Sequence, residues 1–100
     1  MSIELYSPEE IGERLAARMT RLRLAQDLRR ETLAERAGVS PATVKRFEVT
    51  GQVTLANLLR LASALGCLEQ FEGLFAAAPA ASIAELEQRV LARGRRRGRR

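Results

Sequence analysis

Two short helical segments joined by a very tight turn constrain the fold of this chain more than any other feature. The first segment, predicted over residues 30–37, turns three apolar side chains to one face, namely Leu33, Ala34 and Ala37. Gly38 follows it, and glycine favours the positive φ that ends many helices. Ser40 then supplies an N-cap and Pro41 a first helical residue for a second helix over residues 41–48. Two short helices that cross steeply leave the second one exposed, at a size that fits the major groove of DNA.

The remaining segments show similar helix start and stop signals. The run Ser7-Pro8-Glu9-Glu10 is a capping box that begins a helix over residues 9–25. Thr54 caps a further helix that Gly66 ends, and the residues between positions 49 and 53 are predicted to be a loop. Two more helices are predicted, over residues 68–76 and 83–92. Because Leu and Ala dominate the apolar residues and only 4% of the chain is aromatic, we expect an all-α fold.

The basic residues are concentrated in two places. Residues 93–100 contain six arginines and no acid, whereas the rest of the chain has eleven basic and twelve acidic groups. Within that nearly neutral part, residues 14–46 hold nine basic and three acidic side chains. Both concentrations would attract phosphate. We therefore divide the chain into a DNA-binding domain, a linker, an amphipathic C-terminal helix and a disordered Arg-rich tail, at residues 1–76, 77–81, 82–92 and 93–100.

Composition argues against several classes of function. A single cysteine excludes an internal disulfide, and one cysteine without any histidine supplies too few ligands for a structural zinc site. We see no pair of acids and no nucleophile with a base, so we expect no enzyme activity, no metal and no cofactor. The chain has no long apolar run and no signal-peptide core, so we expect no membrane span and a cytoplasmic location.

Two runs of residues carry a family resemblance. Leu33-Ala34-Glu35-Arg36-Ala37-Gly38-Val39-Ser40, followed by Thr43-Val44 and Arg46-Phe47-Glu48, resembles the helix-turn-helix of Cro/repressor-type (Xre family) proteins. This resemblance implies a five-helix, lambda-repressor-like bundle whose third helix enters the major groove. It also implies a homodimer that binds paired half-sites in promoter operator DNA.

A narrower resemblance follows from the C-terminal half. Three runs resemble HipB-like antitoxins, whose toxin partner is a HipA-type serine/threonine kinase: Phe47-Glu48 with Thr50-Gly51, Leu58-Leu59-Arg60-Leu61-Ala62, and Phe71-Glu72 with Leu74-Phe75. This resemblance implies an autoregulating repressor that also neutralises a kinase. The alternative function is that of a stand-alone Xre-type regulator without a toxin. A third hypothesis is a protein-interaction adaptor that does not bind DNA, and the cationic second helix of the motif argues against it.

The resemblance assigns roles to particular residues. The base-reading side chains would be those on the exposed helix: Ala42, Thr43, Lys45 and Arg46. Phosphate contacts would come from the start of the first motif helix, the cap and the loop: Arg30, Ser40, Thr50, Gln52 and Thr54. The charge of the tail, rather than the resemblance, predicts phosphate contacts by Arg95, Arg96 and Arg97.

Each role has a simpler alternative. Arg46 could pair with Glu48 or another surface acid, Lys45 could be only solvated, and Thr43 could only shield the helix backbone. Ser40 is a helix cap before it is a phosphate contact. Other residues are expected to have structural roles: a solvated face for Arg14, Arg18 and Arg21, a core position for Cys67, and either core closure or a dimer interface for Phe71, Leu74 and Phe75. The tail could contact phosphate, contact a partner or aid solubility.

Overall fold

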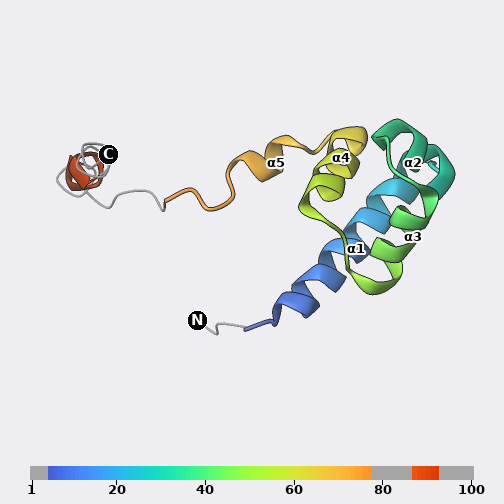
Figure 1. Ribbon diagram of the computed structural model, residues 1–100, viewed down its shortest axis with the longest axis horizontal. Helices are drawn as coiled ribbons and strands as arrows, with labels where there is room; N and C mark the ends of the chain where they lie inside the picture. The colour runs from blue at the N-terminus through green and yellow to red at the C-terminus, as the bar shows by residue number, and fades with distance from the viewer. Residues whose placement is uncertain (1–4, 78–86, 93–100) are drawn as a thin grey trace.

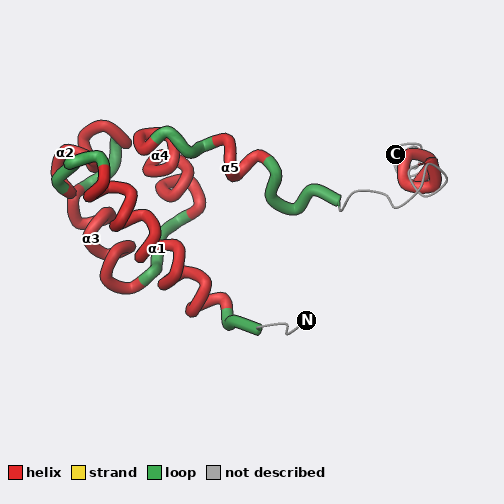
Figure 2. Tube along the Cα trace, turned by 180° about the vertical axis from the view of Figure 1, so that it is seen from behind, coloured by secondary structure: helices red, strands yellow, loops and turns green. Residues whose placement is uncertain are grey.

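The computed structural model describes residues 5–77 and 87–92, and every regular element in these ranges is a helix (Figures 1 and 2). The helices are α1 (Pro8–Ala25), α2 (Arg30–Ala37), α3 (Pro41–Thr50), α4 (Leu55–Leu65) and α5 (Glu69–Glu72). Residues 87–92 are helical as well. Figure 1 shows α1 to α4 gathered into one bundle, from which the chain leads away through α5. The predicted all-helical fold is thus confirmed for the described residues. Residues 78–86, which include most of the predicted linker and the start of the predicted C-terminal helix, lie outside them, as does the Arg-rich tail.

The predicted capping residues define where most helices begin and end. At the start of α1, the Ser7 hydroxyl accepts a hydrogen bond from the Glu10 amide at 3.1 Å, and the Glu10 carboxylate accepts one from the Ser7 amide at 3.0 Å. Gly38 ends α2 with a left-handed backbone at φ 72°, a conformation that disfavours other residues. The bounds predicted for the first two helices therefore agree with the structure within one residue.

Two predicted boundaries are wrong. The helix predicted to end at residue 48 continues to Thr50, because Gly51, at φ 76°, is the residue that caps it. The helix after α4 is predicted over residues 68–76, but α5 spans only Glu69–Glu72, since Gly73 stops it and Phe75 adopts a positive φ of 63°. Leu74 and Phe75 consequently do not close the core, and Phe75 is fully exposed.

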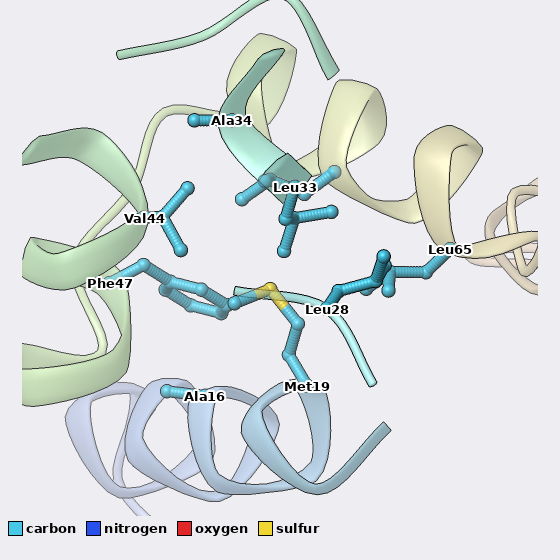
Figure 3. Packing of buried hydrophobic residues seen from close by; sticks show 9 residues of the cluster. Ala16, Met19, Leu28, Leu33, Ala34, Val44, Phe47 and Leu65 are labelled. Atoms are coloured by element: carbon cyan, nitrogen blue, oxygen red, sulfur yellow. The ribbon is translucent and has the colours of Figure 1, made fainter. Parts of the chain in front are cut away.

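The hydrophobic core lies where α1, α2, α3 and α4 meet (Figure 3). Its largest fully buried side chains are Phe47 and Val44 of α3, Leu33 of α2 and Leu61 of α4. Ala34 is also buried, and its small side chain lets α3 approach α2 closely. Burial of a Phe or Leu side chain stabilises a fold by about 1.5–3 kcal/mol, so these residues hold the inner face of α3 on the bundle.

A cluster of three charged side chains fastens α3 from the same side. Glu48 accepts hydrogen bonds from Arg23 of α1, at 2.7 and 3.1 Å, and from Arg30 of α2, at 2.8 Å. The side chains of Arg23 and Glu48 are only 9% and 2% exposed, and Arg23 also donates to the Leu28 carbonyl at 2.8 Å. Three helices are therefore joined through one buried carboxylate.

A close backbone approach joins α1 to the end of α3. A Cβ atom placed on Gly12 would lie 2.8 Å from the Gly51 carbonyl oxygen, and one placed on Gly51 would lie 2.7 Å from the Glu13 amide nitrogen. Both distances are below the normal contact distance of carbon with nitrogen or oxygen, so only glycine fits at either position without movement. This contact fixes the position of α1 along its axis relative to the loop that follows α3.

Candidate nucleic-acid interface

The outer face of α3 is cationic and accessible. Ala42, Lys45 and Arg46 are exposed, whereas Val44 and Phe47 on the opposite face are buried. Because residues on an α-helix repeat every 3.6 positions, burial of positions 44 and 47 directs positions 42, 45 and 46 outward. The predicted orientation of this helix is confirmed.

The first turn of α3 uses its side chains internally. The Ser40 hydroxyl oxygen accepts a hydrogen bond from the Thr43 amide at 3.1 Å, which confirms its predicted role as the N-cap. The two hydroxyls of Ser40 and Thr43 lie 2.9 Å apart and share a further hydrogen bond. Thr43 is half-buried, so its side chain is less accessible than those of its neighbours on this face.

A hollow of about 330 Å³ lies between α3, the loop that follows it and the start of α4. Its walls are Thr43, Arg46, Gln52, Val53, Thr54 and Asn57. Four of these six residues are among those assigned to DNA contact from the sequence. Asn57 is a residue that the sequence reasoning missed. Its position three residues after the Thr54 cap is the signal that could have found it, because the first turn of a helix presents its N–H groups and side chains at one end.

Arg46 is held from the loop side rather than by Glu48. Its Nη2 donates to the Gln52 side-chain oxygen at 2.9 Å. The Thr50 hydroxyl donates to the Arg46 carbonyl at 2.6 Å and accepts a hydrogen bond from the Gln52 amide at 3.1 Å. The backbone amide of Gln52 is therefore bonded within the chain, as is the single hydroxyl hydrogen of Thr50.

Arg30 lies at the start of α2, with its side chain 38% exposed. Burial alone would raise the pKa of the Glu48 carboxyl, but hydrogen bonds and charges from Arg23 and Arg30 outweigh it and hold the pKa below its ordinary value. Glu48 is therefore ionised at neutral pH, and Arg30 keeps its Nη groups free of this pair. The predicted phosphate contact by Arg30 stays a prediction.

The family model described as Helix-turn-helix matches residues 19–70, which begin within α1 and end within α5. The chain belongs to the Xre-type helix-turn-helix family. The match indicates a DNA-binding transcriptional regulator, and both α2 and α3 lie within the matched residues. A search of curated proteins found no match to this chain.

Other predicted residues of this helix-turn-helix protein have varied surroundings. The Thr54 hydroxyl caps α4 by accepting from the Asn57 amide at 3.1 Å. On α1, the guanidinium of Arg14 lies 4.4 Å from the centre of the Tyr6 ring, a cation–π contact that gives this exposed residue a partner. Arg95, Arg96 and Arg97 lie outside the described residues.

Two further observations concern the remainder of the chain. Cys67 is half-buried against the core, and burial, followed by the nearby charge of Glu69, raises the pKa of its thiol. The thiol is therefore protonated at neutral pH and behaves as the small core side chain that the sequence predicted.

In residues 5–77 and 87–92, no helix has the length and apolar character needed to cross a membrane.

Proposed function

We propose that this protein is a sequence-specific transcriptional repressor that inserts α3 into the major groove of operator DNA. The observation that carries the proposal is the accessible cationic face of α3, with Lys45 and Arg46, beside the hollow that reaches the start of α4. Arginine and lysine pair well with the N7 and O6 atoms of guanine in the major groove. Arg30 of α2 and the first turn of α4 would add contacts with phosphates.

The test is binding to the DNA upstream of the protein's own gene. We expect the purified protein to protect a discrete site there in footprinting and to repress a reporter driven by that promoter. Lys45→Ala and Arg46→Ala should each weaken binding to the site, because each removes a groove-facing cation. Arg21→Ala removes the same charge from the exposed outer face of α1 and is the matched control. Unchanged affinity for both α3 variants, with the fold intact, would refute the role of α3.

We propose further that the repressor acts as a homodimer. The family resemblance supports this assembly. So do three apolar side chains beyond α4 in the described part of the chain, since Leu68 is 43% exposed, Leu74 57% exposed and Phe75 fully exposed. Two protected half-sites about 34 Å apart, one turn of the DNA helix, would agree with a twofold dimer. A single protected half-site and a monomeric mass in light scattering would contradict it.

The proposed physiological role is that of an antitoxin in a HipBA-like module. It rests on the resemblance of residues 47–75 to HipB-like proteins. A HipA-type kinase reading frame directly downstream, whose product copurifies with this protein and is inhibited by it, would support the role. A promoter that controls no such kinase would favour the alternative, a stand-alone Xre-type regulator.

A further inference from the structure

The side chain of Arg46 ends in a closed ring of hydrogen bonds that spans α3 and the following loop. Its guanidinium donates to the Gln52 side chain, the Gln52 amide donates to the Thr50 hydroxyl, and that hydroxyl donates to the carbonyl of Arg46 itself. The ring therefore begins and ends at the same residue. Arg46, Thr50 and Gln52 are all exposed, so burial in the core does not explain this arrangement.

The bond to Gln52 leaves Arg46 able to read a base. A guanidinium has five N–H donors in one plane, and the bond to Gln52 uses one of the two hydrogens on Nη2. Whichever hydrogen is used, one parallel pair of donors remains, either Nε with Nη2 or Nη1 with Nη2. Such a pair is what a bidentate contact with the O6 and N7 atoms of guanine requires.

The same bond removes freedom that Arg46 would otherwise lose when DNA binds. An arginine side chain has many rotamers, and its immobilisation at an interface therefore lowers affinity. A guanidinium already held in one orientation loses less on binding. It also meets the base edges at a fixed angle, which favours one base pair over the others.

We propose that Gln52 is a positioning residue that fixes the Arg46 guanidinium for contact with a guanine and thereby determines the base preference at one operator position. This inference rests on the proposed function, and it changes the role of Gln52, which the sequence assigned to phosphate contact. A phosphate contact stabilises all DNA sequences alike, whereas a positioning residue acts at one base pair.

The experiment measures the affinity of each variant for the footprinted operator and for operators with every single base-pair change. Arg46→Ala first identifies the base pair that Arg46 reads, as the position where discrimination falls. Gln52→Ala should lower discrimination at that same position by about tenfold, within the range that one bidentate contact supplies, and leave the other positions unchanged. Adding Gln52→Ala to Arg46→Ala should then have no further effect on discrimination.

A second variant separates positioning from contact. Gln52→Glu keeps an oxygen that can accept from Arg46, so it should restore discrimination at the Arg46 position even though its negative charge weakens binding to all sequences. Two outcomes overturn the inference. One is a Gln52→Ala protein that binds every operator more weakly by the same factor, with a shallower salt dependence. The other is unchanged discrimination in Gln52→Ala. A wild-type protein that binds all the operators equally would instead refute the proposed function itself.

Discussion

Replacement of Glu48 by glutamine tests the charged cluster that fastens α3 to the bundle. The Glu48 carboxylate accepts three hydrogen bonds, two from Arg23 and one from Arg30. Glutamine has nearly the same size but one acceptor oxygen, so at least one arginine N–H loses its acceptor and faces an amide N–H instead. Glu48→Gln also leaves the charge of Arg23, which is 9% exposed, without its counter-charge.

The expected loss follows from the burial of the pair. Removal of one partner from a buried ion pair costs about 3–5 kcal/mol. Because the amide oxygen of Glu48→Gln still accepts at least one of the three bonds, we expect a value near the lower end, about 3 kcal/mol. The domain should remain folded at room temperature, since a stability of about 5–15 kcal/mol is typical. The midpoint of thermal unfolding should fall by about 12–24 °C.

Urea unfolding followed by circular dichroism at 222 nm measures this change, because the described fold is helical. The control is Glu35→Gln, an exposed substitution on α2 that we expect to change stability by less than about 0.5 kcal/mol. If Glu48→Gln costs no more than this control, the carboxylate does not hold the three helices together.

The pH dependence gives an independent check on the same residue. The folded-state pKa of Glu48 lies below its ordinary value of 4.5, so its ionised form stabilises the fold at neutral pH. That contribution is present above the unfolded-state pKa and is lost as the pH falls through the lowered folded-state pKa. The difference in stability between wild type and Glu48→Gln should therefore shrink as the pH falls below about 5. A difference that stays constant down to pH 2 would contradict the assignment.

Three further predictions concern other parts of the chain. Gly12→Ala should destabilise the protein by about 1–3 kcal/mol in the same urea assay, since the new methyl group meets the backbone at Gly51, whereas Gly73→Ala, with open space around it, should not. Thr54→Ala should cost about 1 kcal/mol by removing the cap of α4, and an unaltered midpoint would show that the cap is not needed. Deletion of residues 93–100 should make the affinity for operator DNA less dependent on salt without altering the preferred sequence, and a changed preference in binding selection would show that the tail reads bases.

Local signals in the sequence predicted most of the bundle. Ser7, Ser40 and Thr54 each predict the start of a helix, because their hydroxyls can accept a hydrogen bond from the amide three residues ahead. The structure has each of these caps. These features depend on residues a few positions apart, and interactions over that distance are set by the helix itself.

Features that depend on distant residues were not predictable in the same way. Glu48 and Arg23 are 25 positions apart, and on sequence alone Glu48 was a possible partner for its neighbour Arg46. The structure turns Glu48 inward, so Arg46 is left to bond with Gln52. The contact between Gly12 and Gly51 was also missed, because a glycine within a helix carries no signal of what packs against it.

The position of Glu48 links the stability of the bundle to the function proposed for α3. Val44 and Phe47 anchor the inner face of α3, but apolar packing alone tolerates small rotations of a short helix. The hydrogen bonds of Glu48 to Arg23 and Arg30 are directional, so they add a constraint on that rotation. A variant at Glu48 should therefore weaken operator binding without any DNA contact by this residue. Its loss of affinity should be similar for all operators, unlike the effect at one base pair expected for Gln52, because a rotated α3 misplaces Lys45 and Arg46 together.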